Sequence, residues 1–169
     1  MTAHNAWKCP KISRGRSVLA VDLENISRSG KLQESDADAW WRTLERIFPN
    51  SAELSIVAVD PRNALAGSRF AKLANGSLRC RSGKNGADLA IIEFLDEVVA
   101  TNTRFPERPI THVRLVSGDG IYVNSMRNLR LQGVHITLVS HRDCIHHLHH
   151  RVANKIVLLD DSIPQAVAA

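Results

Sequence analysis

The chain has 169 residues, 44% of them apolar, and a formal net charge of +5 at pH 7. This length and composition favour one compact domain with a single core, and no membrane segment is expected because no apolar run approaches the ~20 residues that cross a bilayer. The three cysteines (Cys9, Cys80 and Cys144) form no C-x-x-C pair, which excludes the usual structural zinc motif and predicts reduced thiols in a cytoplasmic protein.

The first part of the chain is basic. Residues 1–16 contain four lysines or arginines and no acid, a composition that fits a transit peptide and, at least as well, a short arm that touches phosphates. We therefore divide the chain into a basic arm (1–16), one domain (17–160) and a C-terminal tail (161–169). Sixteen arginines against six lysines also favour a polyanionic partner, because the planar guanidinium suits phosphate oxygens.

Strand-like and helix-like patterns alternate along the domain. Short apolar or β-branched runs predict strands at 17–22, 54–59, 78–81, 113–116, 134–139 and 155–159. Apolar residues at helical spacing predict helices at 35–48, 62–74, 88–99, 122–131 and 143–153. This alternation predicts an α/β fold with a Rossmann-like central parallel sheet of about five to six strands and helices on both faces.

Local signals refine this outline. Ser35, with Asp38 three residues later, predicts a capping box at the start of the first helix. Leu65 and Leu89 fall in the apolar pattern of their helices and are expected to face the core. Residues 26–33 are expected to form a loop.

Three aspartates are expected at one edge of this sheet. Asp22 and Asp119 follow two of the predicted strands, and Asp88 opens a helix. Strands end and helices begin at the same edge of a parallel sheet, which is also where such sheets bind ligands. Each acid alone also fits the role of a helix cap. Three together would repel one another unless a cation neutralised them, so we predict a Mg²⁺ or Mn²⁺ site, able to activate water for attack on phosphorus.

The motifs around these aspartates resemble those of a known family. They are VDLEN at 21–25, KNGAD at 84–88 and SGDG at 117–120. In order and spacing they are similar to the motifs of NYN domains, which belong to the PIN-like ribonuclease superfamily. The resemblance covers about residues 17–160.

The resemblance implies a PIN-like sheet and an endoribonuclease that depends on Mg²⁺ or Mn²⁺. Asp22, Asp88 and Asp119 match the metal-binding acids of the family. Asn25 matches the motif amide, which would orient Asp22 or a metal-bound water, and Ser117 matches a position near the scissile phosphate.

One position departs from the family pattern. Many members carry a further acid where this chain has Ile121, which favours an alternative: a non-catalytic RNA-binding or adaptor module with a weakened metal site. Glu24 is an auxiliary candidate for the missing charge because it has the same strand parity as Asp22.

RNA, single-stranded rather than double-stranded, is the expected partner. Lys84, Arg81 and Arg28 lie on loops expected to border the site, where they would hold phosphates. The sequence leaves open a homodimer.

The histidine-rich segment 141–150 allows two interpretations. His146, His149 and His150 have the spacing of zinc ligands on one helix face. However, the apolar residues of the same helix are expected to face the core, which favours an outer, polar histidine face that contacts RNA.

Overall fold

The structure is a computed structural model that describes residues 15–49 and 54–161. The predicted phosphate contacts of the basic arm therefore lie outside the described residues, apart from Gly15 and Arg16 at its end. Within the described part of the chain, no helix is long and apolar enough to span a membrane.

A six-stranded, wholly parallel sheet forms the centre of the protein, with strand order β3-β2-β1-β4-β5-β6. The strands are β1 (Arg16–Asp22), β2 (Leu54–Val59), β3 (Ser77–Cys80), β4 (Ile110–Val116), β5 (His135–Ser140) and β6 (Lys155–Leu158). The sheet is open, and the chain reverses its direction of travel across the sheet between β1 and β4. This confirms the predicted Rossmann-like α/β fold and places a topological switch point between β1 and β4.

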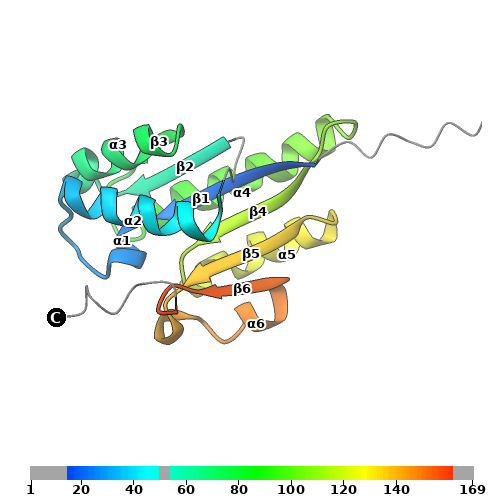
Figure 1. Ribbon diagram of the computed structural model, residues 1–169. Helices are drawn as coiled ribbons and strands as arrows, with labels where there is room; N and C mark the ends of the chain where they lie inside the picture. The colour runs from blue at the N-terminus through cyan, green and yellow to red at the C-terminus, as the bar shows by residue number, and fades with distance from the viewer. Residues whose placement is uncertain (1–14, 50–53, 162–169) are drawn as a thin grey trace, which may run out of the picture.

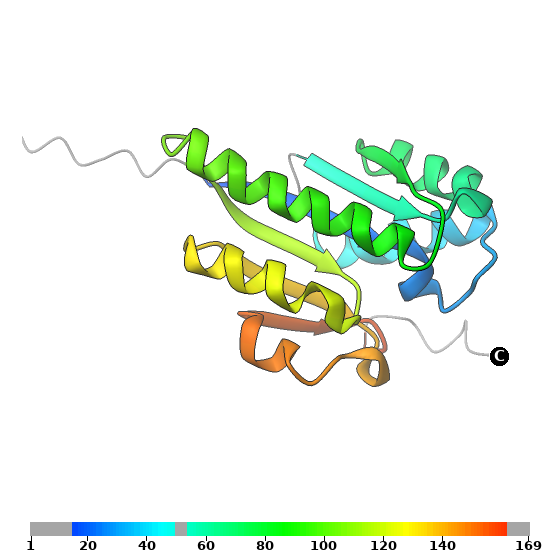
Figure 2. The ribbon, with the colours of Figure 1, turned by 180° about the vertical axis from the view of Figure 1, so that it is seen from behind.

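Helices cover the two faces unequally (Figures 1 and 2). On one face lie α1 (Leu23–Ser27), α2 (Glu34–Ile47) and α3 (Ala64–Leu73). On the other lie α4 (Gly86–Arg104), α5 (Val123–Leu131) and the short α6 (His149–Val152). Three 3₁₀ turns complete the fold, at Pro61–Asn63, Gly120–Tyr122 and Arg142–Cys144.

Strand β1 is buried on both faces, which explains its continuous apolar sequence. Val18 and Ala20 pack into the core beneath α4 and α5. Leu19 and Val21 pack into the core beneath α1 to α3. Because both of its faces are packed, β1 holds its last residue, Asp22, at a fixed place on the carboxyl edge of the sheet.

The predicted loop at 26–33 is wrong at its start, because α1 follows β1 directly. The carboxylate of Asp22 causes this turn: its Oδ1 accepts a hydrogen bond of 3.1 Å from the Asn25 backbone N–H and so caps the helix. The helix ends at Arg28, whose φ of 54° is in the left-handed region.

The capping box of α2 was predicted two residues too late, at Ser35 instead of Gln33. Gln33 is the N-cap, and its backbone N–H donates to Asp36 Oδ2 at 2.8 Å. The predicted partner Asp38 instead forms an ion pair with Arg69 of α3 at 2.7 Å, so it joins two helices rather than capping one.

Two leucines expected in the core are exposed: Leu65 is 77% exposed and Leu89 is 37% exposed. In α3 the small residues Ala66 and Gly67 face the sheet instead. A Cβ on Gly67 would lie 2.7 Å from the side chain of Leu78, so glycine permits close packing of helix on sheet.

Helix α4 is longer than predicted at both ends, since it begins at Gly86 and ends at Arg104. Its last turn is stabilised by Asn102, whose side chain accepts from the Ile110 N–H at 2.7 Å and donates to the Ile110 carbonyl at 2.9 Å. Two side-chain hydrogen bonds to the start of β4 hold this end in place despite its polar sequence.

Candidate active site

The carboxyl edge of the sheet carries a pocket of about 310 Å³. Asp22 ends β1, Asp119 follows β4, and Asp88 lies in the first turn of α4. All three side chains line the pocket, together with Glu24, Asn25, Asp60, Arg62, Arg81 and the turn that leads into α4. Segments far apart in the sequence therefore bring three carboxylates to the switch point.

Asp22 is the most enclosed of the three, with 5% of its surface exposed. Its Oδ2 lies 3.4 Å from the Ser117 hydroxyl and 3.3 Å from the Tyr122 hydroxyl. Burial raises the pKa of Asp22 to about 7, and the negative charges of Asp88 and Glu24 act in the same direction. The carboxyl thus changes charge near neutral pH.

Tyr122 is a site residue that the sequence analysis missed. Its side chain is fully buried, and its hydroxyl donates to Asp88 Oδ1 at 2.6 Å while contacting Asp22. Burial, with the charges of Asp22 and Asp88, raises the pKa of Tyr122 far above its usual range, so the hydroxyl keeps its proton. One hydroxyl therefore connects the two carboxylates.

Asp119 is exposed at the edge of the pocket and caps the 3₁₀ turn after β4. Its Oδ1 accepts from the Ile121 N–H at 3.0 Å. The loop before it is fixed by Asn25, whose Oδ1 accepts from the Gly118 N–H at 3.0 Å. Asn25 was predicted to orient Asp22 or a water. Its backbone does contact Asp22, but its side chain holds the loop that carries Asp119.

Ser117 is fully buried, and its hydroxyl contacts Asp22 and the Asp119 N–H, the latter at 3.3 Å. In the structure it supports two of the acids from within the protein. That Ser117 lies near the scissile phosphate, as the resemblance implies, stays a prediction.

Glu24 is not on a strand, so the parity argument for it was wrong. It lies in the first turn of α1. Its Oε1 accepts from the Asp60 N–H at 2.9 Å and from the Asn63 amide. Glu24 lines the pocket, yet it already joins α1 to the turn after β2.

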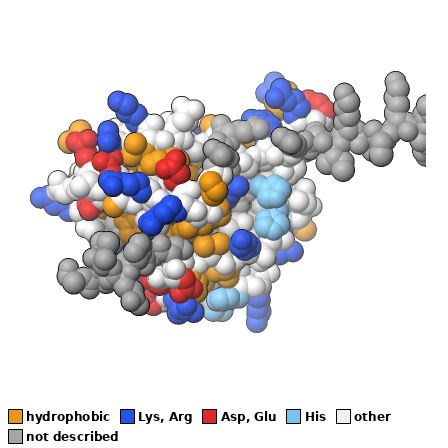
Figure 3. Space-filling view, viewed as in Figure 1, with side chains coloured by type: hydrophobic (Ala, Val, Ile, Leu, Met, Phe, Trp, Pro, Cys, Tyr) orange, Lys and Arg blue, Asp and Glu red, His pale blue; other side chains and the backbone are white. Residues whose placement is uncertain are grey.

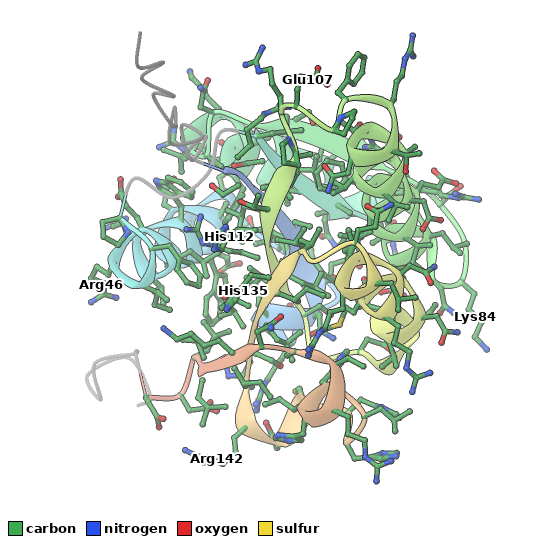
Figure 4. All side chains as sticks on the ribbon, turned by 90° about the vertical axis from the view of Figure 1, so that its right-hand side faces the viewer. Arg46, Lys84, Glu107, His112, His135 and Arg142 are labelled. Carbon is green, nitrogen blue, oxygen red and sulfur yellow. The ribbon has the colours of Figure 1, made fainter. Side chains whose placement is uncertain are left out.

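The three cations predicted to bind RNA are placed differently from one another. Arg81 lines the pocket and forms an ion pair with Glu93. Arg28 pairs with Asp143 and is outside the pocket lining. Lys84 is exposed on the turn before α4, where Figure 4 shows it extending into solvent. Arg62, which was not predicted, lines the pocket and pairs with Asp60.

Ile121 is half-buried and packs against the core formed by α4 and α5. An acid at this position would have to leave that apolar contact to reach the pocket. The apolar packing of this position therefore favours Ile121 over the acid that many NYN domains carry.

The polar groups at this edge are carboxylates, the ligand type that hard divalent cations such as Mg²⁺ and Mn²⁺ prefer. Carboxylate oxygens of Asp22 and Asp88 share one hydroxyl, with Asp119 on the same pocket. Among the residues described, no three Asp, Glu, His or Cys side chains converge closely enough to hold a metal ion by themselves. Mg²⁺ commonly takes only one or two protein carboxylates and fills its other positions with water and phosphate, so two or three loosely grouped carboxylates suit it.

The histidine-rich segment does not form the predicted helix over 143–153. Only α6, His149–Val152, is helical beyond a 3₁₀ turn. His149 is fully buried with Nε2 at 2.8 Å from the Asp119 carbonyl. His141 is buried between the Asp160 carboxylate and the Ile26 carbonyl, each at 2.8 Å. The predicted outer histidine face is therefore wrong for His149, and both buried histidines fix the loops behind the site.

Comparisons with known proteins support the fold alone. No family model matches the sequence, and no curated protein matches it. A crystal structure of a protein of unknown function from Vibrio parahaemolyticus is similar, with a TM-score of 0.64 and 15% sequence identity over 89% of this chain and 97% of that chain.

Proposed function

We propose that the protein is an endoribonuclease that depends on Mg²⁺ or Mn²⁺ and hydrolyses phosphodiester bonds of single-stranded RNA. One observation carries the proposal: Asp22 and Asp88 share the Tyr122 hydroxyl, and Asp119 lines the same pocket at the switch point of the sheet. A buried carboxyl with a pKa near 7 beside two further acids is typical of a functional site, and here it lies where α/β sheets bind their ligands.

The chain's own residues have distinct roles in this proposal. Asp22, Asp88 and Asp119 would hold the cation, which when bound supplies Lewis-acid stabilisation to a phosphoryl group and activates water. Tyr122 positions two of these carboxylates, and Asn25 positions the Asp119 loop. Arg62 extends from the pocket edge with 79% of its side chain exposed, so it is able to contact a phosphate next to the one being cut.

Two further features support a cytoplasmic protein that binds RNA. Cys80 and Cys144 are free thiols, which agrees with a cytoplasmic location. The positive net charge favours association with a polyanion.

The test compares cleavage with binding. Labelled single-stranded RNA is incubated with Mn²⁺ and wild type, Asp119→Asn or the control Asp96→Asn, which changes an exposed acid of α4. Asp119→Asn is expected to lose cleavage yet bind RNA in EDTA at least as tightly as wild type, because one repelling charge is gone. Asp96→Asn should cleave like wild type. Equal background cleavage by all three proteins would overturn the proposal.

The rival function, a non-catalytic RNA-binding or adaptor module, is favoured by Ile121, which leaves the pocket without the further acid. The same assay decides between them. RNA binding by wild type without any cleavage above the Asp119→Asn background supports the adaptor.

A further inference from the structure

One face of the sheet is only partly covered. On the back of the sheet, α4 packs mainly against β1, β2 and β3, and α5 and α6 cover the β5 side. On the front, α1, α2 and α3 cover the half that contains β1, β2 and β3 (Figures 1 and 2). In Figure 1, no helix of the described part of the chain lies in front of β5 and β6. The space-filling view of this side shows histidine side chains and exposed hydrophobic side chains on the same face (Figure 3).

The strand register arranges this open face in two rows. His112 of β4 pairs with His135 of β5. Two residues further along the strands, Arg114 pairs with Thr137, which in turn pairs with Lys155 of β6. Paired residues share a face of the sheet, and so do residues two apart. The five side chains therefore project to the same side, where Figure 4 shows His112 and His135 next to each other.

Arg114 and Lys155 give this face its positive charge. Within residues 15–49 and 54–161, the buried Nη1 of Arg114 and Nδ1 of His135 have no hydrogen-bond partner. A buried donor or acceptor left unpaired destabilises the folded protein, and the effect is larger for a charged group. Strands β4, β5 and β6 contain no acidic residue. Burial and the positive charges of His135 and Arg114 lower the pKa of His112, as expected where cationic groups face one another without an anion.

Planar side chains lie beside the cationic ones on this face. The rings of His112 and His135 have centroids 5.2 Å apart, and the Arg114 guanidinium lies 4.9 Å from the centre of the Phe48 ring at the end of α2. An open sheet face with rings for bases and cations for phosphates is a common way to bind single-stranded nucleic acid.

We propose that this open face, comprising His112, Arg114, His135, Thr137 and Lys155, binds a segment of single-stranded RNA away from the carboxyl-edge pocket. Arg114 and Lys155 contact phosphates, and the two imidazole rings stack on bases. The choice of RNA as occupant rests on the proposed function, while the anionic character of the occupant rests on the cations of the face.

Charge decides against a second copy of the chain as the occupant. An isologous contact would place the same cations against each other across the symmetry axis, and like charges at an interface are costly. An acidic peptide shares the charge of RNA but has no bases to stack on the rings, and it is the alternative that the experiment addresses.

The experiment measures binding of the full chain to a labelled single-stranded 20-nucleotide RNA in EDTA by fluorescence anisotropy. The test variant is His112→Glu/Lys155→Glu, since both residues are exposed. The control is Arg46→Glu/Lys72→Glu, which reverses two exposed cations of α2 and α3 and changes the net charge at least as much. The test variant is expected to bind at least tenfold more weakly than the control, with a salt dependence shallower by about 0.7 for each lost phosphate contact.

Two results would overturn the inference. One is equal RNA affinity of the test and control variants when both melt like wild type. The other is displacement of the RNA by polyglutamate at equal charge concentration, which assigns the face to an acidic peptide. If the test variant does not fold, the ring-proton signals of His112 and His135 in wild type are followed by NMR during RNA titration. They should shift, and unmoved signals would overturn the inference equally.

Cleavage is scored separately in the same proteins. If the test variant loses RNA binding and wild type shows no cleavage, the RNA-binding face is supported and the proposed nuclease activity is overturned. If wild type cleaves RNA and the test variant binds RNA like the control, only the proposed RNA-binding role of the open face is overturned.

Discussion

The hydroxyl of Tyr122 donates a 2.6 Å hydrogen bond to Oδ1 of Asp88 and lies 3.3 Å from Oδ2 of Asp22. These three residues come from β1, α4 and the turn after β4, so the contact joins three separate parts of the site. A hydroxyl carries one proton and so donates fully to only one carboxylate at a time. The second carboxylate, Asp22, accepts from the Asn25 backbone N–H and lies 3.4 Å from the Ser117 hydroxyl. A proton or a cation would neutralise the charge that these contacts leave.

The first prediction concerns Tyr122→Phe, which removes the hydroxyl and keeps the ring. At pH 8 the loss of a buried donor to a carboxylate should lower the free energy of unfolding by about 1.5–3 kcal/mol. At pH 5.5 the loss should be smaller, because Asp22 then carries a proton that can serve Asp88 instead. Urea unfolding at the two pH values measures this, and an equal loss at both would show that the contribution of the hydroxyl does not depend on the protonation of Asp22.

The second prediction follows from the raised pKa of Asp22, about 7 in the folded protein against 3.8 as the usual value. Between these two values the unfolded chain has released its proton and the folded protein keeps it. Stability should therefore fall as pH rises from about 4 to 7 and then level off. Asp22→Asn removes the buried charge, so it should remove this fall and stabilise the metal-free protein at pH 8 by on the order of 2 kcal/mol. A wild-type stability that rises over the same window would contradict the assignment.

The third prediction concerns the cation. At pH 8, Mn²⁺ at ten times its dissociation constant should add about 1.4 kcal/mol to the stability of wild type, or about 3–6 °C in melting temperature. Asp22→Asn, Asp88→Asn or Asp119→Asn should each remove the rise, whereas the control Asp96→Asn should keep it. A rise that persists in all three site variants would place the ion elsewhere.

The sequence was sufficient to predict the parallel sheet and the edge of the sheet where the three aspartates meet. The apolar run of β1 needs two covered faces, and alternation of strands and helices leaves few topologies besides an open parallel sheet. Asp22 and Asp119 follow strands, so their shared edge needed no knowledge of side-chain contacts.

The rest of the site could not be predicted, because it is formed by tertiary contacts that no local sequence pattern encodes. Tyr122 fitted the apolar pattern of a core helix, and nothing in that pattern reveals where its hydroxyl points. Helix α1 has five residues, too few for a helical period, and is caused by the Asp22 carboxylate. His149 was placed on an outer face because one long helix was assumed, whereas the chain bends and buries the ring against the Asp119 carbonyl.

The last prediction concerns Ile121, the position where the family pattern has an acid. If a missing charge limits cation binding, Ile121→Asp should lower the Mn²⁺ concentration that gives half-maximal cleavage and half of the melting-temperature rise. Ile121 is half-buried against the core of α4 and α5, so the change should also cost about 1–3 kcal/mol of stability. Ile121→Asn has the same shape without the charge and is the matched control: it should show the stability loss but not the gain in Mn²⁺ affinity. Identical Mn²⁺ titrations of the two folded variants would mean that charge at this position has no effect on the ion, and the weakness of the site would then need another cause.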